Sequence, residues 1–334
     1  MTSIDPNVPL HGVIPPITTP LTPDGEVDVA SLERLVEFEV AAGVHAIFAL
    51  GTGGEGPYLT DDQRETVLDT VTRVVAGRIP VLVGVTDIGT RRALHNAAIS
   101  VRYAIDGLVS TPPFYGSVGW TEIDAHFRAI HAAHADLPLY AYDIPGFVGV
   151  KLPAELTVQL AHDGVIAGVK DTSDEEDGFR YIIEETRDLP GFAVITGSDI
   201  TGDAAIFQGA HGMIVGVANI DPHGFVRVYD AAVAGDWDAA RAEQERLHKL
   251  RLIAKIAAKR ISPFSATLGA FKAAQVHRGI IENDLLQAPL QNLDAEEKAA
   301  VVAVRERQSL GPVAQLAGAR YEQRAVASAS GRSR

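Results

Sequence analysis

The chain has 334 residues, a net charge of −14 and no cysteine. This acidity disfavours binding to nucleic acid or to an anionic membrane surface, and the lack of cysteine excludes disulfides, cysteine nucleophiles and thiolate metal sites. Hydrophobic residues make up 46% of the chain, which is ordinary for a globular protein and sufficient for a large core.

Short apolar runs rich in Val and Ile recur every ~25–30 residues, and we predict that each is a buried parallel strand. In chain order these runs lie at 13–18, 46–50, 81–85, 107–110, 139–142, 166–170, 193–196 and 212–216. Amphipathic stretches of helical length separate them, most clearly at 31–40, 61–75, 91–103 and 121–134. The chain therefore alternates strand and helix.

Eight such units predict an α/β fold, a (β/α)8 TIM barrel over residues 1–235. A doubly wound sheet with an inserted domain is the alternative, but no dinucleotide-binding fingerprint follows the first strand. Three further helices, at 236–260, 263–277 and 294–307, have no strands between them and predict a C-terminal helical appendix over 236–310. Residues 311–334 are rich in Ala, Ser, Gly and Arg and predict a flexible tail.

Barrel enzymes carry their active sites at the C-terminal ends of the strands, so a lysine in that position is informative. The chain has seven lysines, and of these only Lys170 ends an apolar strand. Burial at a barrel mouth favours the neutral amine over the ammonium, and a neutral amine attacks ketones to form a Schiff base. The alternatives are a solvated lysine at a strand end and an ion pair with Asp171.

Two neighbouring strand ends suggest partners for this lysine. Tyr142 ends the preceding strand, where a phenol can shuttle protons, although a lone tyrosine is also a common core residue. The glycine-rich loop at 51–56 lacks the ending of a phosphate-binding loop. We predict that the backbone N–H groups of Thr52, Gly53 and Gly54 form an anion nest for a carboxylate; the alternative is a flexible turn.

Five motifs occur in order, each at a different strand end: Gly51-Thr52-x-Gly54-Glu55, Pro113-Phe114-Tyr115, Tyr142-Asp143-Ile144-Pro145, Gly168-Val169-Lys170-Asp171-Thr172 and Gly197-Ser198-Asp199. Together they resemble the pyruvate-dependent class I aldolase superfamily, which includes dihydrodipicolinate synthase, N-acetylneuraminate lyase and 2-keto-3-deoxygluconate aldolase. The resemblance covers the barrel, and the helical appendix is also typical of this superfamily.

The resemblance implies a role for each matching residue. Lys170 would form the Schiff base with pyruvate or another 2-oxo acid, and Tyr142 would donate and accept the proton at the reacting carbon. Thr52 would link Tyr142 to Tyr115 of a neighbouring subunit, which implies a homodimer or homotetramer. The pyruvate carboxylate would bind to the Thr52–Gly53 backbone. The covalent imine needs no cofactor and no metal.

Departures from the family pattern bear on the second substrate. Phe147 stands where the lysine-biosynthesis synthase carries an arginine, and a phenyl ring cannot pair with a carboxylate. We therefore predict that aspartate semialdehyde is not the natural acceptor. Thr172 is typical of members that cleave sugar acids, and Asp199 would accept a hydrogen bond from another hydroxyl. Gly53 and Phe114 replace hydroxyl-bearing residues, and the remaining predicted contacts are Gly197 and Gly216, the latter where sialic acid lyases carry serine.

These observations favour an aldolase that cleaves a 2-keto-3-deoxy sugar acid to pyruvate and an aldehyde. The alternatives within the same imine chemistry are a dihydrodipicolinate synthase-type condensation and a 2-oxo acid dehydratase. A barrel that has lost catalysis and binds a 2-oxo acid is the non-enzymatic alternative. The N-terminus lacks the order of a signal peptide, and no apolar run reaches the ~20 residues of a membrane helix, so we expect a cytoplasmic protein without membrane or nucleic-acid partners.

Overall fold

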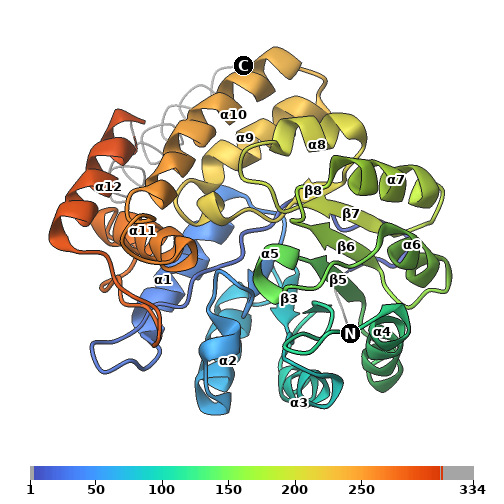
Figure 1. Cartoon of the computed structure of the whole chain (residues 1–334). Coiled ribbons are helices and arrows are strands. Elements are labelled where there is room, and N and C mark those ends of the chain that lie inside the picture. Colours follow the sequence, from blue (N-terminus) through green and yellow to red (C-terminus); the bar gives the residue numbers. More distant parts are fainter. Residues whose placement is uncertain (1–3, 309, 311–334) are drawn as a thin grey trace, which may run out of the picture.

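Eight short parallel strands alternate with helices along the chain (Figure 1). The computed structural model describes residues 4–308 and residue 310. The strands pair in the order β1-β8-β7-β6-β5-β4-β3-β2. Their bounds are β1 (Gly12–Val13), β2 (Ile47–Ala49), β3 (Val81–Gly84), β4 (Gly107–Ser110), β5 (Leu139–Asp143), β6 (Gly168–Asp171), β7 (Ala193–Thr196) and β8 (Gly212–Met213). Each lies within or beside a predicted run, and the predicted (β/α)8 architecture is confirmed.

The barrel closes between β1 and β2 through a short bridge. Pro16 pairs with Phe48, and the N–H groups of Ile17 and Phe48 donate to the carbonyls of Phe48 and Pro15, both at 3.0 Å. Proline has no N–H to donate, so the predicted strand at 13–18 is reduced to two residues followed by this bridge. The bridge completes the cylinder that surrounds the interior side chains.

Most helices cover the outside of the cylinder, whereas the short α5 lies over its middle (Figure 1). Their bounds are α1 (Val29–Ala42), η1 (Gly56–Tyr58), α2 (Asp61–Val75), α3 (Thr90–Ser100), α4 (Trp120–Ala133), α5 (Pro145–Val148), α6 (Ala154–His162), α7 (Glu176–Thr186), α8 (Gly202–Gln208), η2 (Gly216–Asn219) and α9 (Pro222–Val233). Helix α2 shows why they begin where they do: Thr60 accepts from the Gln63 N–H while the Gln63 side chain accepts from the Thr60 N–H.

The period-two alternation of the strands divides the core into two parts. On β2, Phe48 points into the barrel, whereas Ile47 and Ala49 pack outward against the helices. On β5, Tyr140 and Tyr142 point inward, and Leu139 and Ala141 pack outward. The inward residues form an aromatic and aliphatic core inside the barrel, beneath its C-terminal mouth.

The C-terminal helices are α10 (Trp237–Arg251), η3 (Leu252–Lys255), α11 (Pro263–His277) and α12 (Ala295–Arg307). They gather on one side of the barrel, beside α1 and α9 (Figure 1). The prediction of one helix over 236–260 is wrong, because α10 ends at Arg251 and tightens into a 3-10 turn. Ser262 caps α11 and Pro263 starts it, so the chain must turn before that point and α11 packs back against η3.

The boundaries of the predicted barrel and appendix, at residues 235 and 310, remain predictions. The predicted flexible tail at 311–334 lies outside the described residues. Among the helices that the structure describes, none has the length and apolar character required to cross a membrane.

Candidate active site

Strand register brings Lys170 and Tyr142 side by side at the C-terminal end of the barrel. The Cα of Tyr142 on β5 pairs with that of Lys170 on β6, which pairs in turn with Ile195 on β7. Lys170 is 5% exposed and Tyr142 is 4% exposed. Because paired residues on neighbouring parallel strands share a face of the sheet, the amine and the phenol both point into the barrel interior.

Two aromatic rings flank the amine of Lys170. Its Nζ lies 3.9 Å from the ring centroid of Tyr142 and 5.5 Å from that of Phe48. These two rings meet edge to face, with centroids 6.4 Å apart and an interplanar angle of 79°. The faces of these rings attract a cation, and the two aromatic side chains hold the amine of Lys170 at the floor of the site.

Neither alternative for this lysine fits the structure. A 5% exposed side chain is not solvated, and no carboxylate of the described chain lies within ion-pair distance of its Nζ. The Asp171 carboxylate instead accepts from the N–H and the hydroxyl of Ser173, both at 2.7 Å. The amine is thus free to meet a ligand.

A pocket of about 340 Å³ opens above Lys170 at the barrel mouth. Most of the predicted site residues line it, namely Lys170, Tyr142, Thr52, Gly53, Thr172, Gly197, Asp199, Gly216 and Phe147. Gly54 and Tyr115 do not line it. The structure therefore brings together residues from five strand ends that are spread over 165 positions of the sequence, from Thr52 to Gly216.

Gly54 serves the fold of the glycine-rich loop and does not face the pocket. Its N–H donates to the Gly51 carbonyl at 3.1 Å, and its carbonyl accepts from the Thr19 hydroxyl at 2.7 Å. Of the three N–H groups predicted to form an anion nest, only those of Thr52 and Gly53 belong to residues that line the pocket. The anion nest stays a prediction, and Thr52 and Gly53 are the two residues whose position suits it.

Tyr115 lies away from Lys170 in the single chain. Its side chain is 95% exposed, its backbone adopts φ of +83°, and it lines a separate groove with Trp120 and Lys151. In the described chain, no hydrogen bond joins the Thr52 hydroxyl to the Tyr142 phenol. The relay from Tyr142 through Thr52 to Tyr115 is therefore not assembled within one subunit.

Thr172 lines the pocket and carries a hydroxyl that the described chain leaves without a partner. Its Oγ1 is buried and has no hydrogen-bond partner among the described residues. It lies over Gly197, where a Cβ of any larger residue would overlap it. An unsatisfied buried hydroxyl costs free energy, so this group is suited to a ligand that supplies the missing hydrogen bond.

Asp199 lines the pocket and also makes two contacts within the protein. One carboxylate oxygen accepts from the Val217 N–H at 3.0 Å, and the other accepts from Nε of Arg251 at 2.8 Å. The second contact holds the C-terminal helix α10 against the barrel mouth. The contact predicted between Asp199 and a substrate hydroxyl stays a prediction.

One wall of the pocket was not predicted from the sequence. This wall comes from the C-terminal helices and comprises His248, Arg251, Leu252, Lys255, Phe264, Thr267, Leu268 and Phe271. None of these residues follows a strand, so the barrel rule does not point to them. The signal in the sequence is a group of four basic residues within 248–255 of an otherwise acidic chain.

The loop after β5 carries Phe147 to the pocket edge. Phe147 is 54% exposed and meets Phe264 edge to face at 4.9 Å. Asp143 anchors the loop by accepting from Lys151 and from the Leu152 N–H. Burial raises the pKa of Asp143 to about 6, although these two hydrogen bonds favour its carboxylate.

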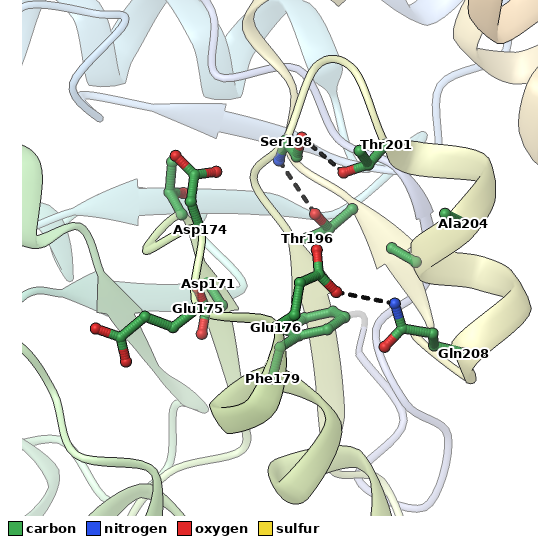
Figure 2. A pocket seen from close by; sticks show the side chains of 12 residues that line it. Asp171, Asp174, Glu175, Glu176, Phe179, Thr196, Ser198, Thr201, Ala204 and Gln208 are labelled. Atoms are coloured by element: carbon green, nitrogen blue, oxygen red, sulfur yellow. Dashed lines mark hydrogen bonds between the residues drawn. The ribbon is translucent and has the colours of Figure 1, made fainter.

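A second pocket of about 300 Å³ lies between α7 and α8 (Figure 2). Its walls are acidic and hydroxylic: Gln208 donates to Glu176 at 3.0 Å, and the Thr201 hydroxyl donates to that of Ser198 at 2.8 Å. It shares Thr172, Asp174 and Ser198 with the Lys170 pocket but contains neither Lys170 nor Tyr142. Within residues 4–308 and 310, no group of three acidic or histidine side chains is arranged to hold a metal ion.

Comparisons with known proteins agree with this geometry. The model of the dihydrodipicolinate synthetase family matches residues 9–308. The chain is 34% identical to an uncharacterised DapA-like lyase of Halobacterium salinarum, over 88% of this chain and 92% of that protein. It is similar in structure to dihydrodipicolinate synthase of Bacteroides thetaiotaomicron, with a TM-score of 0.84, 30% identity and coverage of 90% and 99% of the two chains.

A further similar structure is YagE, a dihydrodipicolinic acid synthase family protein of Escherichia coli K12 solved in complex with pyruvate. The TM-score is 0.84 at 26% identity, and the match covers 90% of this chain and 99% of that one.

Proposed function

Because the chain belongs to the dihydrodipicolinate synthetase family of class I aldolases and lyases, we propose that it cleaves a 2-keto-3-deoxy acid reversibly to pyruvate and an aldehyde through a lysine Schiff base. The observation that carries this proposal is the buried Lys170 amine, 3.9 Å from the Tyr142 ring at the floor of a pocket. YagE, which is similar in structure, was solved with pyruvate.

The residues of the pocket suit each step of this chemistry. The neutral Lys170 amine attacks the ketone carbon, and loss of water gives the iminium. Tyr142, which gives its proton to the departing water and is left as a phenolate, then accepts the proton of the C4 hydroxyl as the C3–C4 bond breaks, which releases the aldehyde and leaves an enamine. Protonation of the enamine at C3 and addition of water release pyruvate and restore the amine. The Thr52 and Gly53 N–H groups are the proposed contacts of the pyruvate carboxylate.

The unused Thr172 hydroxyl favours a hydroxylated substrate. It requires a donor or acceptor that the described chain does not supply, and a sugar-acid hydroxyl would supply it. The Thr172 hydroxyl fills the space beside Gly197, and the Phe271 ring fills the space beside Gly216, so both positions exclude a larger residue. The Thr172 hydroxyl is the feature that favours a 2-keto-3-deoxy sugar acid over a simple 2-oxo acid.

A dihydrodipicolinate synthase-type condensation remains the second candidate, since Bacteroides thetaiotaomicron dihydrodipicolinate synthase is similar to this chain. We propose that aspartate semialdehyde is a poor acceptor, because Phe147 packs on Phe264 and offers no donor to a carboxylate. Condensation of pyruvate with aspartate semialdehyde at an ordinary enzymatic rate would reverse this order. A 2-oxo acid dehydratase would be recognised by release of water without an aldehyde.

The assembled enzyme is proposed to be a cytoplasmic homodimer or homotetramer without a metal or other cofactor. The support is Tyr115, whose phenol is 95% exposed in the single chain and which a second subunit would carry to the Lys170 pocket. This chemistry needs only the 2-oxo acid, the aldehyde and further copies of the chain as partners.

Borohydride reduction in the presence of pyruvate tests the proposal. We expect covalent pyruvate on Lys170, identified by mass spectrometry of the peptide, and neither trapping nor turnover in Lys170→Ala. Lys259→Ala, which removes an exposed lysine outside the pocket, is the matched control and should retain both. Trapping in Lys170→Ala would reject the assignment, and reversible binding of pyruvate without trapping would favour the non-catalytic barrel.

Tyr142→Phe tests the proton transfer separately. Imine trapping should persist, whereas aldol cleavage should slow by about 10²–10⁴-fold, the usual contribution of a positioned acid–base group. Single-turnover cleavage monitored by pyruvate release measures the step. A variant that cleaves within a few-fold of the parent would remove Tyr142 from this role.

A further inference from the structure

Three basic side chains stand at the rim of the Lys170 pocket, on the side away from the barrel strands. His248 and Arg251 belong to α10, and Lys255 belongs to η3. The chain as a whole carries a net charge of −14, so this local excess of positive charge opposes the general trend. Its place is set by the end of α10 at Arg251, which turns Lys255 toward the same pocket.

Arg251 is held with part of its guanidinium unused. Its Nε donates to Asp199 at 2.8 Å, and Asp199 is fixed in turn by the Val217 N–H. The terminal nitrogens of Arg251 make no hydrogen bond to the described residues. The Arg251 side chain is 28% exposed, so a planar pair of donors faces the pocket in a fixed orientation, which suits a carboxylate or a phosphate.

Lys255 and His248 add unpaired donors beside this guanidinium. Both are exposed, and neither forms an ion pair within the part of the chain that the structure describes. Two carboxylates line the pocket: Asp199, which Arg251 engages, and Asp174, which comes from the loop after β6. No acidic side chain of the C-terminal wall offsets the three basic groups.

We propose that the substrate carries a second anionic group, a carboxylate or a phosphate, at the end remote from the Schiff base, and that Arg251 and Lys255 bind it. This inference rests on the proposed aldolase function, since the ketone is placed at Lys170. The proposal is compatible with Phe147, which offers no positive charge. The charge that binds the remote group comes from α10 and η3 and not from the loop after β5. The aldehyde product is then an anionic aldehyde.

Matched aldehydes test this proposal in the synthetic direction with pyruvate. Glyceraldehyde 3-phosphate is compared with glyceraldehyde, and succinic semialdehyde is compared with butanal. In the parent protein, we expect kcat/KM to be at least tenfold higher for the anionic member of one pair. The pair that shows the preference distinguishes phosphate from carboxylate. Equal use of the anionic and neutral members in both pairs would overturn the proposal.

Variants of the rim locate the effect. Arg251→Gln and Lys255→Gln should each lower the ratio of anionic to neutral kcat/KM about tenfold or more, and Arg251→Lys should restore part of it. Lys249→Gln removes an exposed charge from the same helix outside the pocket and should leave the ratio unchanged. An equal fall in Lys249→Gln would mean that the preference is a general charge effect. Arg251→Gln also removes the contact with Asp199. If that variant does not fold, Lys255→Gln alone tests the role of the rim.

Two readouts separate this proposal from the proposed function. Borohydride trapping of pyruvate on Lys170 tests the function alone. Calorimetric binding of inorganic phosphate and of succinate tests the rim alone, because neither ligand has a ketone. We expect binding of one of these anions to weaken at least tenfold in Arg251→Gln and to persist in Lys249→Gln. If the affinity for phosphate and succinate is the same in Arg251→Gln as in the parent, the proposed anion site is wrong, even if borohydride trapping succeeds.

Discussion

At the scale of single residues, burial acts on two basic side chains of the barrel in different surroundings. Lys170 lies over two aromatic rings that attract its ammonium. His126 on α4 is buried among neutral hydroxyls and bonds to Thr90 at 2.9 Å and to Ser110 at 3.2 Å. Burial lowers the pKa of His126 to about 4. His126 therefore stays neutral near pH 7 and links α3, β4 and α4.

This lowered pKa predicts a dependence of stability on pH. An unfolded histidine takes up a proton near its ordinary pKa of about 6.5, whereas folded His126 resists protonation until about pH 4. The unfolded state thus binds more protons across this window, and the free energy of unfolding falls as pH falls from 6.5 toward 4. At pH 5 the loss from this residue should be about 2 kcal/mol relative to pH 7.

Urea unfolding of the parent and of His126→Gln at pH 7 and pH 5 measures this loss. Glutamine cannot titrate, so the variant should lose about 2 kcal/mol less between the two pH values. His95→Gln, which changes an exposed histidine, should lose as much as the parent. If His126→Gln and the parent respond equally to pH, the histidine is not the group responsible.

The reacting residues could be predicted from the sequence, but their supports could not. Lys170 and Tyr142 each end an apolar strand, and the barrel rule places strand ends together. Asp199 also follows a strand, but its partner Arg251 lies 52 residues further along the chain. A contact over such a separation depends on how the C-terminal helices pack, which no local pattern of residues encodes.

At the scale of elements, a buried ion pair fastens the glycine-rich loop to α11. Glu55 and Lys272 pair with both side chains fully buried. Glu55 also accepts from the Gln287 N–H at 2.7 Å, and Lys272 donates to the Leu285 carbonyl at 2.6 Å. Since Glu55 lies two positions after Gly53, this pair fixes the loop that is proposed to hold the pyruvate carboxylate.

Breaking this pair should be costly. Lys272→Met leaves the Glu55 carboxylate buried without its cation, and we expect a loss of about 3–5 kcal/mol in the free energy of unfolding. Glu55→Gln combined with Lys272→Met removes both charges and should be less destabilised than Lys272→Met alone. Lys298→Met breaks the partly exposed pair with Asp284 and should cost about 1 kcal/mol or less. Urea titration of the parent and the three variants measures these free energies of unfolding. Equal losses in Lys272→Met and Lys298→Met would contradict the expectation.

Element existence was easier to predict than element ends. The strands at 107–110 and 193–196 and the helices at 61–75 and 263–277 agree with the structure at both bounds, because apolar periodicity and caps are local signals. The stretch 236–260 keeps a helical pattern beyond Arg251, yet the backbone tightens there so that α11 can pack against η3. Tertiary packing overrides local propensity at this point.

At the scale of the whole molecule, the groove beside Tyr115 is the face proposed to meet a second copy. Trp120 is 54% exposed next to it, and the positive φ of Tyr115 is a strained conformation that packing by a partner would stabilise. A barrel pattern predicts one subunit well, because its signals repeat along the chain. It says little about how subunits meet, since that depends on surface shape.

We predict that the parent sediments as a dimer or a tetramer and that Trp120→Asp shifts it toward the monomer. Turnover should fall with dissociation, whereas pyruvate trapping on Lys170 should persist, because the amine belongs to one chain. Tyr181→Asp, which changes an exposed tyrosine on α7, should sediment as the parent does. A fully active monomeric parent would reject the role of Tyr115.

The origin of the pocket wall in α10, η3 and α11 has an evolutionary consequence. The residues proposed to make and break bonds lie in residues 52–170, whereas one wall of the pocket comes from residues 248–271. Substitutions in the later stretch can therefore reshape this wall while the cylinder stays unchanged. In related proteins, divergence of specificity should be sought in that later stretch first.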